Sequence, residues 1–231
     1  MFSRETYMER RKLVAKRIKS GILLFPGNGE SGMNYKDNWY PFRQDSTFLY
    51  YTGIDQPYLY FLIDIDNDRE ILFGNDATPE EMVWIGAAEP LAALTERVGI
   101  AQVRPIKGLS EYLKTARSKG QEIHFLPPYR PELKIQLGEL LGIPVQEVEA
   151  RKSIPFIKAV IAQRSIKSAE ELAEINKAVN ITAAMHTHAI RRTKHGRSEK
   201  EMAGELQAIA IAGGGNISFP IIFTKNGQYL H

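Results

Sequence analysis

The chain has 231 residues, more than the roughly 100–200 residues of a usual single domain, so we expect two structural units. Hydrophobic residues make up 43% and charged residues 25% of the chain, proportions that exclude an intrinsically disordered protein. The net charge of +3 comes from 30 basic and 27 acidic residues scattered along the chain, which is too mild to indicate a nucleic-acid partner.

The first predicted element is a helix. From Arg10 through Lys19, basic residues alternate with Leu13, Val14 and Ile18 at helical spacing, which is typical of a solvated amphipathic helix. A buried strand is expected at 21–25. The glycines that follow it match the dinucleotide fingerprint G-x-G-x-x-G, but no amphipathic helix comes next to face a pyrophosphate, so we reject a nucleotide site.

Strands and helices then alternate along the chain. The residues at 66–68 form turns readily, so the strands on either side of them should pair as a hairpin. The predicted strands are 47–51, 58–65, 70–73, 102–106, 122–126 and 144–147, and the predicted helices are 79–85, 89–98, 109–119, 131–141 and 154–163. This alternation predicts an α/β fold with a mixed sheet and flanking helices.

The pattern changes near residue 165. Ser168 with Glu171 forms a capping box, and an apolar stripe marks the long helix behind it, made of Leu172, Ile175, Val179, Thr182, His186 and Ala189. Ser198 with Glu201 repeats the capping box and begins a second helix. The glycines at 213–215 end that helix, and a strand is expected at 218–224. We therefore predict two domains, 1–164 and 165–231. The second is too short for a core of its own and is expected to be incomplete.

Two groups of residues invite a functional reading. His186 and His188 lie two residues apart on a helix and so face different directions, which favours one packed histidine, His186, and one solvated histidine, His188, over a metal site. Arg43 and Asp45 lie between aromatic residues, and their local chemistry allows either a buried ion pair that holds a loop or a role in shaping a substrate entrance.

Cysteine is absent, which excludes disulfides and thiolate metal sites and is consistent with a reducing compartment such as the cytoplasm. No apolar run approaches the ~20 residues that cross a bilayer, and the N-terminus lacks a signal-peptide pattern. We expect a cytoplasmic protein with no membrane and no nucleic-acid partner.

Three segments together resemble one known family. Residues 40–53, which read YPFRQDSTFLYYTG, resemble the signature of the N-terminal domain of Xaa-Pro aminopeptidases in the creatinase/prolidase metallopeptidase superfamily. Ile166-Lys167-Ser168 resembles the family's linker into its catalytic domain. The segment from Ser218 to His231 resembles the strand pair that reaches its first active-site histidine.

The resemblance implies a creatinase-like N-terminal α/β domain followed by the opening of a pita-bread catalytic domain. It implies hydrolysis of the bond before a proline at the second position of a peptide, by two divalent ions, commonly manganese, whose shared water attacks the carbonyl. His231 matches a substrate-binding, catalytic histidine, and the family's metal ligands all follow it. We therefore expect this chain to be an inactive front part that binds no metal or other cofactor itself.

Two other functions stay open. A prolidase, which acts on Xaa-Pro dipeptides, would share this architecture, and a non-catalytic binding or oligomerisation module would belong to another class. We also expect a homo-oligomer. The sequence does not distinguish these functions, and it does not identify the physiological metal.

Overall fold

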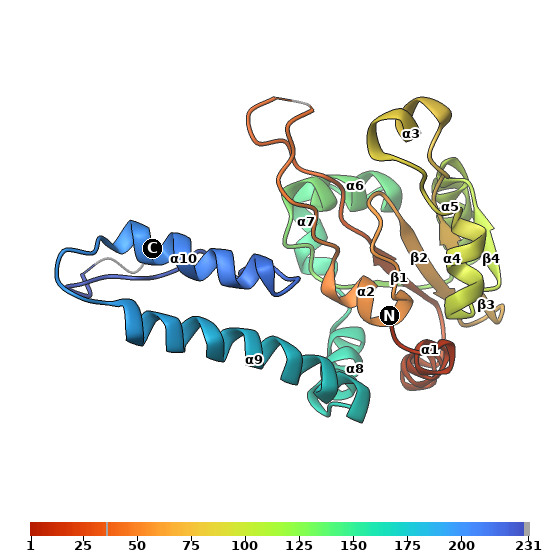
Figure 1. The fold of residues 1–231 in the computed structure, drawn as a ribbon. Coiled ribbons are helices and arrows are strands. Elements are labelled where there is room, and N and C mark those ends of the chain that lie inside the picture. The colour runs from red at the N-terminus through yellow and green to blue at the C-terminus, as the bar shows by residue number, and fades with distance from the viewer. Residues whose placement is uncertain (36, 229–231) are drawn as a thin grey trace. The chain divides into compact units, whose positions relative to one another are not determined.

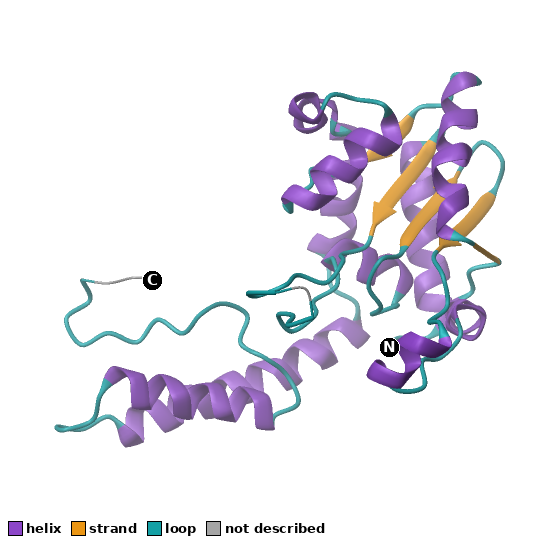
Figure 2. Cartoon of the chain, turned by 90° about the horizontal axis from the view of Figure 1, so that it is seen from above, coloured by secondary structure: helices purple, strands orange, loops and turns teal. Residues whose placement is uncertain are grey.

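A computed structural model of the chain describes residues 1–35 and 37–228. The chain divides into two compact units, and the boundary along the sequence falls between Ile166 and Lys167. The first unit is an α/β domain in which helices cover both faces of a mixed five-stranded sheet (Figures 1 and 2). The fold class predicted from the alternation of elements is therefore confirmed.

The sheet has the strand order β4-β3-β2-β1-β5. Its strands are β1 (Ile22–Pro26), β2 (Tyr60–Asp64), β3 (Arg69–Phe73), β4 (Gln102–Arg104) and β5 (Ile123–Phe125). The predicted hairpin is present, since β2 and β3 are antiparallel, and β1 also pairs antiparallel with β2. The outer strands are parallel to their neighbours, β5 to β1 and β4 to β3. Parallel pairing places the carboxyl ends of β1 and β5 at one edge of the sheet.

The helices of the first unit mostly match the predicted ranges. They are α1 (Arg4–Ile18), α2 (Ser46–Thr52), α3 (Pro79–Ile85), α4 (Leu91–Val98), α5 (Leu109–Ser118), α6 (Pro131–Leu141), α7 (Val145–Val148) and α8 (Ile154–Ser165), with short 3₁₀ turns at Ile106–Gly108 and Glu149–Arg151. None of the described helices is long and apolar enough to span a bilayer.

Side chains of β1 alternate between the two cores, as the period of two in a strand requires. Leu23 and Phe25 enter the core formed with α1, α2, α4 and α8. Ile22 and Leu24 enter the core formed with α5, α6 and α7. A strand that is apolar on both faces is therefore explained by helices on both sides of the sheet.

Two predicted strands are helices. Residues 47–51 lie within α2, because Asp45 caps the helix start and Gly53 ends it in the left-handed conformation, with φ of 66°. Residues 144–147 lie at the start of the short helix α7. Pro144 is the residue before this helix, and Val148 at its end is fully buried. In both segments the local backbone signals outweigh the strand propensity of the apolar residues.

The N-terminal helix is not uniformly solvated, which corrects the sequence prediction. Arg11 is completely buried. Its Nε donates to Glu70 at 2.8 Å, and its two terminal nitrogens donate to backbone carbonyls of Tyr51, Val98 and Gly99 at 2.9–3.1 Å. The buried guanidinium thus joins α1 to α2, α4 and β3.

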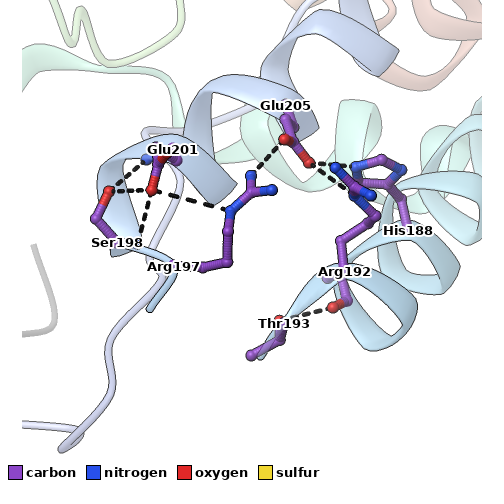
Figure 3. Close-up of polar contacts among 8 residues, drawn as sticks. His188, Arg192, Thr193, Arg197, Ser198, Glu201 and Glu205 are labelled. Carbon is purple, nitrogen blue, oxygen red and sulfur yellow. Dashed lines mark hydrogen bonds and ion pairs between the residues drawn. The ribbon is translucent and has the colours of Figure 1, made fainter. Parts of the chain in front are cut away.

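The second unit begins with two helices, α9 (Ala169–Arg192) and α10 (Glu199–Ala212). Both predicted capping boxes are present, Ser168 with Glu171 and Ser198 with Glu201. Figure 3 shows the polar contacts between the helices: Glu205 accepts hydrogen bonds from Arg197 and from His188 Nε2, the latter at 2.6 Å. The buried face of α10 carries Met202, Leu206 and Ala210, spaced four residues apart.

Three predictions for this unit are wrong. His186 is exposed and His188 is partly buried against Glu205, the reverse of what the apolar stripe predicted. The stripe residues Leu172, Ile175 and Val179 are exposed, because α10 packs against a different side of α9. Residues 218–224 form no strand in the part of the chain that the structure describes, since no neighbouring strand offers hydrogen-bond partners there.

Candidate functional site

A cavity of about 480 Å³ lies where β1 and β5 end. In α/β proteins, ligands commonly bind outside the carboxyl ends of parallel strands. We name it the β1–β5 cavity. Most of its polar lining comes from the loops after the two strands and before α2, namely Asn28, Arg43, Asp45, Tyr129 and Arg130, and the start of α2 adds Ser46 and Thr47. Its apolar wall on α8 comprises Ile157, Val160 and Ile161.

The buried side chain of Gln44 fixes the loop between β1 and α2. Its Oε1 accepts hydrogen bonds from the backbone N–H of Asn28 at 2.7 Å and of Asp45 at 2.8 Å. Gly27 donates its N–H to the carbonyl oxygen of Leu59 at 2.7 Å. A Cβ on Gly27 would also lie 2.7 Å from that oxygen, so this close approach requires glycine.

Asp45 is the N-cap of α2 and not the partner of a buried ion pair. Its Oδ1 accepts hydrogen bonds from the backbone N–H of Thr47 at 2.9 Å and of Phe48 at 2.8 Å. Arg43 is exposed and forms no ion pair with Asp45 within residues 1–35 and 37–228. The ion-pair hypothesis is therefore wrong. Both side chains line the β1–β5 cavity, and their role at a substrate entrance stays a prediction.

Asn28 is only 1% exposed and connects the two loops. Its Nδ2 donates to the Arg43 carbonyl and to the Tyr129 hydroxyl, both at 2.9 Å. Its Oδ1 is buried and has no hydrogen-bond partner among the described residues. The Asp45 carboxylate lies beside the Tyr129 hydroxyl, and desolvation raises the pKa of Tyr129, so the phenol stays protonated.

Two guanidinium groups and one carboxylate set the charge of the cavity. Arg130 donates from one terminal nitrogen to the Gly29 carbonyl at 2.8 Å and lies 3.8 Å from Glu132. Arg43 is open to solvent. With Asp45 as the one acidic side chain of the lining, the local charge favours a ligand that carries an anionic group beside hydrogen-bond donors.

The described residues contain no group of three or more histidine, aspartate or glutamate side chains that could hold a metal ion. They therefore do not fit the pair of divalent ions that the family resemblance implies, and we derive no chemical step through a metal. His231, the predicted catalytic residue, lies outside the described residues.

Sequence reasoning missed Asn28, Gln44, Tyr129 and Arg130. Asn28 belongs to the glycine-rich segment that matches the dinucleotide fingerprint. Among the described residues no helix immediately follows this segment, as expected when the nucleotide site was rejected. The available signal was the presence of polar residues directly after two predicted buried strands. This signal becomes informative only if β1 and β5 are known to be parallel neighbours, which the sequence does not reveal.

Comparison with known proteins connects the fold to a family. The family described as "Aminopeptidase P, N-terminal domain" matches residues 7–124. A probable Xaa-Pro aminopeptidase of Metarhizium robertsii is 26% identical over 93% of this chain and 42% of its own length. The chain thus spans about two fifths of that curated relative.

Two solved structures of Escherichia coli aminopeptidase P have the same fold. The low-pH form superposes with a TM-score of 0.75 and 21% identity, over 93% of this chain and 50% of its own. The zinc-substituted enzyme in complex with product gives a TM-score of 0.74 and 21% identity, over 92% of this chain and 50% of its own. In both comparisons about half of the solved chain has no counterpart here.

Proposed function

The chain belongs to the aminopeptidase P family, whose N-terminal domain it contains over residues 7–124, and we propose that it is the front part of an Xaa-Pro aminopeptidase. The whole protein would remove the N-terminal residue from peptides with proline at the second position. The family match carries this proposal. The relatives' names and the shared α/β fold support it.

The metal chemistry would belong to the whole protein. We propose that it uses two divalent ions, commonly manganese in this family, to activate the attacking water. The second unit would be the opening of the pita-bread catalytic domain, with His231 contributing a hydrogen bond to the reacting carbonyl. We expect a cytoplasmic protein. Self-association is supported by apolar side chains at the surface, such as Trp84 of α3, which is 85% exposed.

A prolidase is the less favoured alternative, because the relatives reported above carry aminopeptidase names. A non-catalytic module is the alternative from another class. It is motivated by the first unit, which has two apolar cores of its own and a ligand-sized cavity without a metal-ligand cluster in the described residues.

The decisive experiment uses the full-length gene product. After loading with manganese, it should release the first residue of Gly-Pro-Leu faster than it cleaves Gly-Pro, whereas a prolidase would show the reverse preference. The 231-residue chain, assayed in parallel, should retain no stoichiometric manganese by elemental analysis and should cleave neither peptide. A full-length product that is inactive on both peptides with two ions bound would refute the peptidase proposal and favour the module.

A further inference from the structure

We propose that the β1–β5 cavity is a binding site for a free α-amino acid with a small aliphatic side chain. The inference rests on three features of the cavity, namely a carboxylate with free acceptor positions, a pair of guanidinium groups and an apolar recess. It does not depend on the proposed peptidase activity, because all of these residues lie in the first unit.

The first feature is the Asp45 carboxylate, which lies in a fixed frame of polar groups. The buried amide of Asn28 donates both of its N–H groups, one to the Arg43 carbonyl and one to the Tyr129 hydroxyl. These two hydrogen bonds join the loops on either side of Asp45.

Asp45 makes an ammonium group the best donor. Its carboxylate already accepts two backbone N–H groups, but two carboxylate oxygens offer about four acceptor positions. An ammonium ion beside Asp45 would therefore gain a charge-assisted hydrogen bond. A neutral amide or hydroxyl ligand would gain less.

The second feature is the pair of arginines, Arg43 and Arg130, that line the same cavity. A guanidinium group has five N–H donors in a planar fork, which matches a carboxylate. The hydrogen bonds of Arg130 to Gly29 and Ser31 come from one of its nitrogens. A lining with one acidic and two basic side chains suits a zwitterion, whose two charges are fixed a few ångströms apart.

The third feature is a recess beside the cavity. It has a volume of about 40 Å³ and shares Asp45, Leu126 and Tyr129 with the cavity lining. Leu24, Phe25, Leu133 and Leu137 also line it. This apolar space accepts a small branched side chain and excludes a charged or large one. The α8 residues Ile157 and Val160 complete the apolar wall.

Binding of L-valine to the 231-residue chain, measured by isothermal titration calorimetry, tests the proposal. We expect saturable binding with one site per chain. Isovalerate, which lacks the ammonium group, and isobutylamine, which lacks the carboxylate, should each bind at least about tenfold more weakly, because each loses one set of charge-assisted hydrogen bonds.

Two variants locate the site. Arg43→Gln should weaken valine binding about tenfold, while Arg151→Gln should leave it unchanged, since Arg151 is an exposed arginine that pairs with Glu147 and does not line the cavity as described. Ile161→Trp should fill the cavity and abolish binding without unfolding the chain, because Ile161 is exposed. Absence of saturable binding by the folded chain, or equal effects of the two arginine variants, would overturn the proposal and leave the peptidase proposal untouched.

Discussion

Arg11 is a charged residue whose side chain is completely buried. Burial lowers the pKa of its guanidinium, although the neighbouring Glu70 carboxylate acts in the opposite direction. Substitution Arg11→Met would remove the cation while leaving Glu70 and three backbone carbonyls without their donor. We expect the free energy of unfolding to fall by about 3–5 kcal/mol.

Denaturant unfolding of the Arg11→Met chain provides the measurement. Arg17→Met is the matched control on the same helix, since Arg17 is exposed, and it should change the free energy of unfolding by no more than about 0.5 kcal/mol. Equal stabilities of the two variants would mean that the buried guanidinium contributes nothing beyond its aliphatic stem.

His231 gives a second prediction at the scale of a single residue. In the full-length enzyme, His231→Ala should lower turnover at least about tenfold, because an N–H donor to the developing oxyanion stabilises the transition state more than the bound substrate. Both metal ions should stay bound, since the resemblance places the ligands elsewhere. Wild-type turnover of the variant, or loss of its metals in elemental analysis, would contradict this role.

At the scale of elements, Glu205 holds α9 and α10 together by polar contacts. Hydrogen bonds from Arg197 and His188 lower the pKa of this carboxyl from 4.5 to about 2. A lowered pKa in the folded state means that the carboxylate stabilises the fold above its unfolded pKa. This contribution is lost as the pH falls from about 4.5 toward 2. The α9–α10 pair should therefore loosen progressively over this range of pH.

Helical circular dichroism of Glu205→Gln tests this contribution. The variant should lose helix at a lower temperature than the wild type at pH 6, and the difference should shrink steadily as the pH approaches 2. Glu9→Gln, which removes an exposed carboxylate from α1, should show no such pH-dependent difference. A difference between Glu205→Gln and the wild type that is the same at pH 6 and pH 3 would contradict the role of the ionised carboxylate.

At the scale of the whole molecule, exposed apolar surface predicts association. Leu172, Ile175 and Val179 lie on one exposed face of α9, and such a stripe is typical of a helix that packs against a partner. We expect the 231-residue chain to self-associate in light scattering. Replacing all three side chains by glutamine should shift the chain toward the monomer.

Replacing Lys12, Lys16 and Lys19 by glutamine is the control, because it alters a solvated part of the chain without removing apolar surface. If the unmodified chain is strictly monomeric, or if both triple variants dissociate equally, the α9 face does not drive association. The proposed amino-acid site would be unaffected by either result, since it lies wholly within residues 1–166.

Features that depend on neighbours along the chain can be predicted from the order of the amino acids. Both capping boxes, the hairpin of β2 and β3, and the ends of α3 and α6 follow from local hydrogen bonding and hydrophobic periodicity. The signature segment at 40–53 indicates the family from the amino-acid sequence alone. These signals are local, so they could be read without knowing how distant segments meet.

Features that depend on contacts between distant residues follow from the packing of the folded chain. The burial of Arg11 requires carbonyls from residues 40 and more positions away, and the exposed stripe on α9 depends on the side to which α10 packs. The β1–β5 cavity exists because strands a hundred residues apart are parallel neighbours, which brings Asn28 to Tyr129. The hydrophobic periodicity of a segment predicts which face of a helix or strand is apolar. The packing of the whole chain determines which element covers that face.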